Sequence, residues 1–302
     1  MISWLDDRLA DLGIARTGPV RVTRERAWGT VSTAPTTDGP VWLKVPGPSV
    51  AFEVALYELL DSVVPDRVPR ALAVDVPRGR LLLADGGPTL PDDDFSALGG
   101  MLASYGALQR ELESHVDSLL AVGVADMRPA AMPARFDEAL AVAERTAAPD
   151  DRPALDRIAG LRSEFGGWCA RLAGSPVPAS IDHNDLHPGN VFAAGPRFYD
   201  WGDAVVAHPF ASMLVALGFL HLRHGRTAAD PMFVRMRDAY LEPFTGLAPR
   251  ASLVAEVELA CRVGKVARAL TWERAAGSSA EFARAPLETL LALDADWFSL
   301  QA

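Results

Sequence analysis

The chain has 302 residues, of which 49% are hydrophobic and 23% charged, a composition typical of one large or two modest globular domains. Its net charge of −10 argues against nucleic acid as a partner, because neutralising phosphates requires clustered Lys and Arg. Two isolated cysteines, Cys169 and Cys261, make neither a disulfide framework nor a zinc site, so we expect a reducing, cytoplasmic location. The longest apolar run, 210–222, is too short to span a bilayer, and we expect no membrane contact.

Residues 1–88 are predicted to form a small lobe built mainly of strands. A helix is expected over 3–12, with Ser3 as its cap and Gly13 at its end, and its apolar residues form one stripe. The strand-like stretches lie at 20–26, 30–34, 41–45, 71–76 and 80–84, and a second amphipathic helix is expected over 50–62. The glycine-containing stretch 85–88 marks the expected end of this lobe.

Residues 89–302 are predicted to form a larger, helical lobe. A strand and a loop over 176–190, and a short strand over 197–200, interrupt its helices. Apolar residues recur at three- to four-residue spacing over 95–122, 133–145, 153–172, 209–224, 229–243, 250–276 and 281–299. A sheet-rich lobe followed by a helical lobe is an α+β arrangement. It is the layout of a two-lobed kinase, which holds its nucleotide in the cleft between the lobes.

The motif that carries chemistry is HNDLHPGN, at 183–190, followed by Asp-Trp-Gly at 200–202. Phosphoryl transfer requires a carboxylate that orients the attacking hydroxyl, oxygen ligands for magnesium and a cation on the phosphates. An Asp and an Asn five residues apart on one loop supply a base and a metal ligand together. We therefore expect Asp185 to be the catalytic base, with Asn190 and Asp200 as ligands of Mg²⁺.

These motifs resemble the catalytic loop and the metal-binding triplet of the aminoglycoside phosphotransferase and choline kinase superfamily, which has a protein-kinase-like fold. The resemblance implies an ATP- and Mg²⁺-dependent enzyme that phosphorylates a hydroxyl group of a small molecule. Lys44, one of two lysines in the chain, stands where the family places the lysine that holds the α- and β-phosphates. Glu53, nine residues later, would pair with it, although Glu58 on the same helix is a competitor.

The expected nucleotide site departs from the protein-kinase pattern at its phosphate loop. No G-x-G-x-x-G precedes Lys44; the segment is Ala-Trp-Gly-Thr-Val at 27–31, in which Thr30 is the expected nucleotide contact. In the hinge-like segment 81–87, the carbonyl of Ala84 and the amide of Gly86 would meet adenine. Two further departures concern Ser212, where many relatives have an Asp that braces the catalytic loop, and Gln109, where relatives often have a His.

Several polar residues near the motif have two interpretations each. His187 either approaches the transferred phosphate or packs against the loop, and His183 is expected to hold the loop by hydrogen bonds. Asp203 is expected to be a cap or a brace of its loop. The basic residues on the helix over 250–276 are expected to face solvent, and these are Arg262, Lys265 and Arg268.

Two other functions use part of the same residues. A metal-dependent hydrolase would use His183, Asp185 and His187 as ligands, but it leaves Asn190 and Lys44 without a role. A nucleotide-binding pseudokinase would have the same fold without turnover. The complete set of Lys44, Asp185, Asn190 and Asp200 argues against it, although Ser212 leaves it open. The kinase hypothesis explains the most residues. Relatives phosphorylate aminoglycosides, amino alcohols, amino acids or sugars, so the acceptor stays open. The sequence does not indicate an oligomeric state.

Overall fold

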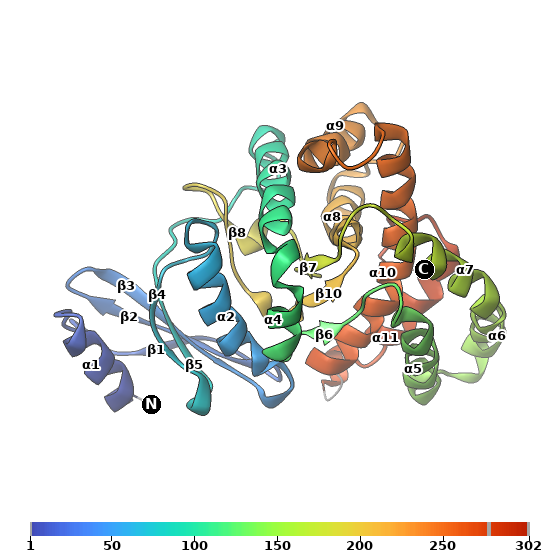
Figure 1. Ribbon diagram of the computed structural model, residues 1–302. Helices are drawn as coiled ribbons and strands as arrows, with labels where there is room; N and C mark the ends of the chain where they lie inside the picture. The colour runs from blue at the N-terminus through green and yellow to red at the C-terminus, as the bar shows by residue number, and fades with distance from the viewer. Residues whose placement is uncertain (1, 277–278, 301–302) are drawn as a thin grey trace.

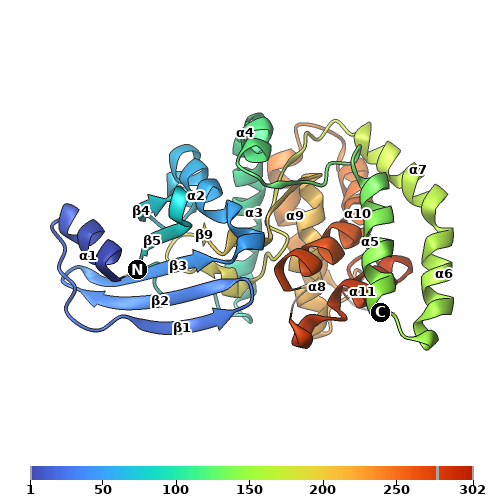
Figure 2. The same cartoon turned by 90° about the horizontal axis from the view of Figure 1, so that it is seen from below.

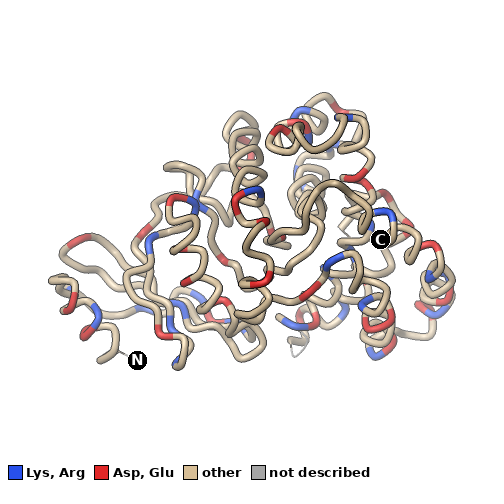
Figure 3. The backbone as a smooth tube through the Cα atoms, viewed as in Figure 1, with Lys and Arg blue, Asp and Glu red and all other residues tan. Residues whose placement is uncertain are grey.

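A computed structural model describes residues 2–276 and 279–300. A sheet-rich part and a helical part lie side by side, as Figures 1 and 2 show, which confirms the predicted α+β fold class. Acidic and basic residues are interspersed along both parts (Figure 3). Among the described residues, no helix is long and apolar enough to cross a membrane.

The first part is a five-stranded antiparallel sheet with strand order β1-β2-β3-β5-β4. Its strands are β1 (Arg21–Arg26), β2 (Gly29–Thr36), β3 (Gly39–Pro46), β4 (Ala71–Asp75) and β5 (Arg80–Ala84). Side chains alternate between the faces of a strand, so Leu43 packs against helix α1 (Ile2–Asp11) while Lys44 faces the cleft. Helix α2 (Phe52–Val63) contacts β4 and carries Glu53.

The second part is mainly helical. Its helices are α3 (Phe95–Leu112), α4 (Val116–Ala121), α5 (Met132–Thr146), α6 (Arg152–Gly160), α7 (Arg162–Ala173), α8 (Met213–His224), α9 (Pro231–Leu241), α10 (Arg250–Ala276) and α11 (Ala285–Leu291). The predictions of single helices over 95–122 and 153–172 are wrong. The first is interrupted by a 3₁₀ turn at Glu113–His115, and the second breaks after Gly160, a residue with low helix propensity.

Short strands inside the helical part hold the predicted catalytic loop. Strand β10 (Val205–Ala207) lies between β6 (Ala125–Asp126) and β7 (Ser180–Asp182), and β8 (Val191–Phe192) pairs with β9 (Arg197–Phe198). The loop leaves β7 and enters β8.

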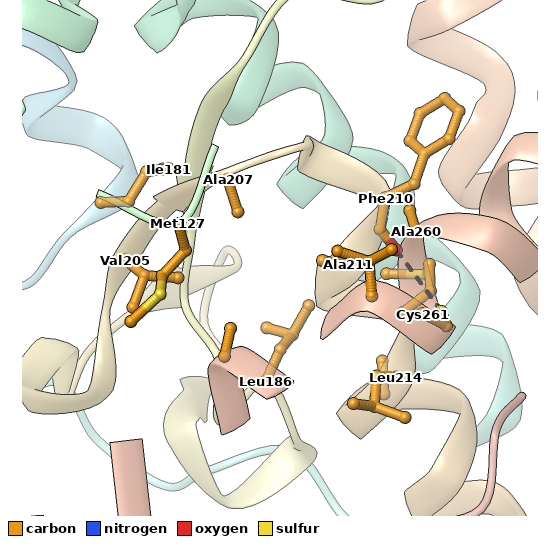
Figure 4. Close-up of a cluster of buried hydrophobic side chains, with 14 of the residues drawn as sticks. Met127, Ile181, Leu186, Val205, Ala207, Phe210, Ala211, Leu214, Ala260 and Cys261 are labelled. Carbon is orange, nitrogen blue, oxygen red and sulfur yellow. Dashed lines mark hydrogen bonds between the residues drawn. The ribbon is translucent and has the colours of Figure 1, made fainter. Parts of the chain in front are cut away.

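Buried apolar side chains anchor this loop along its length. Ile181, Leu186 and Val191 come before, within and after the turn that it makes, and each is fully buried. Figure 4 shows Ile181 and Leu186 in the cluster that also contains Phe210 and Cys261. The thiol of Cys261 donates a hydrogen bond to the Phe210 carbonyl, and both cysteines are buried and free. The polar loop therefore rests on a rigid apolar base.

Candidate active site

Backbone strain marks the two turns on which the site is built. Asn184 and Asp200 have φ angles of 59° and 64°, and they are the non-glycine residues with positive φ in the described ranges. Such conformations are costly and concentrate at functional sites, where the surrounding structure enforces them. The side chain of Asn184 donates to Thr271 of α10, and its backbone amide donates to the Asp182 carboxylate. These bonds stabilise the turn that presents Asp185.

Lys44 joins the sheet to the helical part of the molecule. Its Nζ lies 2.5 Å from Oε1 of Glu53 and 2.5 Å from Oδ1 of Asp200. Burial alone would lower the pKa of Lys44, but the two carboxylates outweigh it and raise the pKa, so the ammonium stays charged. Glu58 is exposed on the same helix, which leaves Glu53 as the partner.

Asp185 is held from three sides. Its Oδ1 accepts from Arg268 at 2.9 Å, and its Oδ2 accepts from the Asn190 amide at 3.0 Å and lies 3.5 Å from Nε2 of His187. Burial alone would raise the pKa of Asp185, but the Arg268 guanidinium and His187 outweigh it and hold the pKa well below its usual value. The carboxylate is therefore ionised and oriented, as a proton acceptor for a hydroxyl must be.

Arg268 is a site residue that sequence reasoning missed. The prediction that this basic group faces solvent is wrong, because Lys265 and Arg268 are both buried. Besides Asp185, Arg268 contacts the carboxylate of Asp203 at 2.9 Å and the carbonyl of Asn184 at 2.5 Å. Its guanidinium also stacks on Trp272. The signal was available in the small or apolar residues at its helical neighbours 264, 267 and 271, which indicate a buried face.

The two histidines of the motif have different surroundings. The ring of His183 is buried against Trp201, and its Nε2 bonds to the carbonyl of Tyr199. His187 accepts a hydrogen bond from the Gly189 amide through Nδ1 and stacks on Phe219. Both rings are engaged by the loop and its supports, an arrangement that favours positioning roles. Within residues 2–276 and 279–300, no three His, Cys, Asp or Glu side chains are grouped to bind a metal.

Two adjoining cavities meet at Lys44 and Asp200. One, of about 390 Å³, runs along β3 and β5, and the other, of about 370 Å³, opens beside Asp185. Trp42 and Leu83 line the first, and Trp272 and Phe282 line the second. Both cavities are lined by Arg24, Lys44, Glu53 and Asp200. Each cavity has the size of a small-molecule site.

The three remaining predicted nucleotide contacts, Ala84, Gly86 and Thr30, differ in where the structure places them. Ala84 lines the first cavity between Leu83 and Asp85. Gly86 lies against the ring of Phe192, which a Cβ would approach to 2.3 Å, so packing requires glycine there. Thr30 is a correction. It pairs with Val45 next to the Val31–Lys44 pair, and alternation therefore turns its side chain away from the cleft.

The oxygen donors present suit a magnesium ion. The Asn190 amide nitrogen donates to both the carbonyl and the carboxylate of Asp185, which leaves the amide oxygen of Asn190 free to act as a ligand. Asp200 lines the same cavity and adds a carboxylate, and burial is outweighed by Lys44, which keeps the pKa of Asp200 below its usual value. One amide and one carboxylate oxygen fit Mg²⁺, which prefers oxygen ligands and takes others from phosphates and water.

Comparison with known proteins places this site in a family. A sequence profile of the phosphotransferase enzyme family matches residues 34–253, well over half of the chain. The chain belongs to this family. Family membership confirms the resemblance inferred from the catalytic loop and makes the chain a small-molecule phosphotransferase. No protein of curated function matches the sequence closely enough to count as a relative.

Solved structures share the family fold over nearly the whole chain. A macrolide 2′-phosphotransferase from Brachybacterium faecium superposes with a TM-score of 0.57 at 20% identity, covering 95% of this chain and 97% of that one. A choline/ethanolamine kinase family protein from Mesorhizobium loti gives 0.61 at 18% identity, covering 98% and 96%. An ethanolamine kinase from Plasmodium vivax gives 0.64 at 12% identity, covering 93% and 83%.

Proposed function

We propose that this phosphotransferase moves the γ-phosphate of ATP to a hydroxyl group of a small molecule. One observation carries the proposal: Lys44, Asp200 and Asp185 meet where the nucleotide-sized cavity joins the second cavity. Residues 1–88 and 89–302 act as the two lobes, and the nucleotide lies between them. The family allows an aminoglycoside-like antibiotic, an amino alcohol, an amino acid or a sugar as acceptor.

The nucleotide occupies the cavity along β3 and β5. Its base lies near Ala84 and its phosphates reach Lys44, a compact charge that Glu53 holds in place. Asn190 and Asp200 would hold Mg²⁺, and the ion would neutralise negative charge on the phosphates. The acceptor enters the second cavity and points its hydroxyl at Asp185.

Asp185 then orients the attacking hydroxyl and takes its proton as the phosphoryl group leaves ADP. Positioning accounts for most of catalysis in this chemistry, since the protein has little covalent work to do. The hydrogen bonds from Asn190 and Arg268 fix the carboxylate before the acceptor arrives. A pseudokinase is disfavoured because Lys44, Asp185, Asn190 and Asp200 all converge on one place.

The test combines a substrate survey with one variant. ATP consumption is measured with a panel of hydroxylated metabolites and antibiotics, and the best acceptor is then used with Asp185→Asn. We expect turnover to fall roughly 10²–10⁴-fold, the usual effect of losing a general base, while ATP affinity stays nearly unchanged. Asp117→Asn, on the exposed face of α4, is the matched control. Near-normal turnover in a folded Asp185→Asn protein would refute the assignment.

A further inference from the structure

The geometry points to Arg24 on β1 as a second phosphate-binding cation, one that contacts the γ-phosphate of the bound nucleotide. This inference rests on the proposed function and adds a residue that the catalytic motifs do not contain. It follows from the register of the sheet, from the position of the side chain and from the shape of the neighbouring turn.

A β-bulge places Arg24 in the cleft. Val22 pairs with Ser32, and Arg24 pairs with Val31, so the register between β1 and β2 shifts at Thr23. An unbroken ladder would set Thr23 opposite Val31 and turn Arg24 to the other face of the sheet. Bulges of this kind occur next to active sites, where they redirect a side chain.

The shifted register aligns Arg24 with the phosphate-binding lysine. Val31 pairs with Lys44 on the next strand, so Arg24, Val31 and Lys44 form one row across the sheet. Directly opposed residues in an antiparallel sheet point to the same face. The row therefore brings two cations to the cleft face at the level where Asp200 approaches from the helical part.

Arg24 lies at the point where phosphoryl transfer would occur. It lines both cavities, and its guanidinium is 3.5 Å from Oδ2 of Asp200. Among the described residues, Arg24 and Lys44 are the basic side chains shared by the two cavities. Lys44 is bound on two sides by carboxylates, whereas the Arg24 side chain is 57% exposed and has donors available. A planar guanidinium suits phosphate oxygens, which it binds with two parallel hydrogen bonds.

The turn between β1 and β2 explains why a side chain is needed here. The glycine nearest to this turn is Gly29, the first residue of β2, and a Cβ there would come within 2.8 Å of the Val45 carbonyl. A Cβ on Gly47 would come within 2.9 Å of the Ala27 carbonyl, and the Gly47 amide donates to Trp28. Both glycines therefore allow the turn to pack closely against the end of β3. A turn fixed in this way offers no glycine-rich cradle, and Arg24 supplies the charge in its place.

A purely structural role for Arg24 predicts different behaviour. An exposed arginine that makes one 3.5 Å contact with a carboxylate contributes little to stability. If Arg24 acted only by holding Asp200, its loss would disturb the metal site and weaken ATP and ADP alike. A direct contact with the γ-phosphate affects only the nucleotide that carries one.

The experiment measures Mg²⁺-dependent binding of a non-hydrolysable ATP analogue and of ADP by calorimetry, so it needs no acceptor. We expect Arg24→Gln to weaken the analogue roughly tenfold, the usual scale for a hydrogen bond to a charged group, and to change ADP affinity less than about twofold. Arg24→Lys keeps the positive charge but not the planar guanidinium, so it should lose less affinity for the analogue than Arg24→Gln. Arg78→Gln, an exposed arginine after β4, is the matched control.

The outcomes separate the two proposals. Equal weakening of analogue and ADP, or no weakening of either, in a folded Arg24→Gln protein would overturn the role of Arg24 while leaving the kinase intact. Selective weakening in Arg24→Gln that also occurs in Arg78→Gln would overturn it too. Failure of the unaltered protein to bind either nucleotide would instead contradict the proposed function.

Discussion

Arg268 determines how the Asp185 carboxylate behaves. It occupies Oδ1 of Asp185 with a 2.9 Å hydrogen bond, while Trp272 covers one face of the guanidinium. A half-buried carboxylate without a cation beside it would bind a proton more readily. Arg268 is therefore a positioning residue that keeps the proposed base ionised.

We predict that Arg268→Gln makes turnover sensitive to acid. The amide can still donate to Asp185, but the positive charge is lost, so burial then raises the pKa of the carboxylate. Because the base works only when deprotonated, the acidic limb of the kcat profile should move up by about one pH unit or more. Steady-state rates from about pH 5 to about pH 9 measure this shift.

The charge-conserving variant Arg268→Lys provides the control. It should keep the acidic limb near its original position even where its maximum rate is lower, because the cation remains beside Asp185. A uniform loss of rate in Arg268→Gln, with an unshifted profile, would show that Arg268 has only a structural role. Thermal melts of both variants verify folding.

At single residues, sequence reasoning could point to the site where chemistry limits the choice of residue, and it failed where tertiary register decides. Asp185, Asn190 and Asp200 were predicted from their types and spacing and Lys44 from the family resemblance. The structure places all four around one cavity, and their roles stay predictions. Thr30 was misplaced because only strand pairing tells that Val31, and not its neighbour Thr30, faces the cleft. The bulge that redirects Arg24 likewise leaves no mark in the apolar pattern.

A buried polar network supports the element that carries the catalytic loop. Asp182, at the end of β7, accepts hydrogen bonds from the Ser212 hydroxyl and the Asn184 amide. Gln109 of α3 donates to Ser212 and accepts from Tyr240. Many relatives have a bracing carboxylate at 212, and here the carboxylate of Asp182 on β7 takes its place. Ser212 donates to Asp182, and Gln109 in turn donates to Ser212.

We predict that Asp182→Asn changes how stability depends on pH. Burial raises the pKa of Asp182 to about 6, above the roughly 3.9 of an unfolded Asp. The folded protein thus binds the extra proton between these values, and its stability falls as pH rises through them. Asparagine cannot ionise and its oxygen can still accept both bonds, so the variant escapes this loss.

The free energy of unfolding of Asp182→Asn, relative to the unaltered protein, should therefore rise by an amount of the order of 2 kcal/mol between about pH 4 and about pH 7. Urea melts at several pH values measure it. A difference that stays constant over this range would contradict the prediction. Asp117→Asn, which changes an exposed carboxylate, should show no comparable trend.

Element positions were predicted well where periodicity is strong. The strand over 41–45 and the helix over 50–62 correspond to β3 and α2 within about two residues. Breaks in helices were missed, since apolar spacing continues across the 3₁₀ turn at 113–115 and across Gly160. Packing decides where such a helix bends, and packing involves residues distant in sequence.

Across the whole molecule, the cleft is bridged by charge and by aromatic rings. Lys44 and Arg24 from the sheet both contact Asp200 of the helical part. At the mouth of the second cavity, Trp28 meets the edge of Phe282, which stacks on Trp272 of α10. The sequence predicted the order of the two parts but not the contacts that Lys44, Arg24 and Trp28 make across the cleft, because each of these joins residues more than 150 positions apart.

The proposed binding of Mg·ATP would require the Asp200–Lys44 ion pair to be exchanged for contacts with the ligand. In the structure the Asp200 carboxylate is paired with Lys44. In the proposed complex Asp200 would hold Mg²⁺ and Lys44 would contact the phosphates. The ligand then links both parts of the molecule. A ligand that binds only the folded state stabilises it by mass action, by about 2.7 kcal/mol at a hundredfold excess over Kd.

We therefore predict that Mg·ATP raises the melting temperature of the protein by several degrees, whereas ATP with a chelator gives a much smaller shift. Asp200→Ala should lose most of the Mg²⁺-dependent shift, since it removes the charged ligand. Without added ligand, the melting temperature of Asp200→Ala should fall by less than the Mg²⁺-dependent shift that the variant loses, because Lys44 keeps Glu53 as a partner. Asp38→Ala, at the exposed turn after β2, removes one carboxylate elsewhere and should respond like the unaltered protein. An Asp200→Ala protein with a full Mg·ATP shift would show that the metal is held elsewhere and would remove Asp200 from the proposed site.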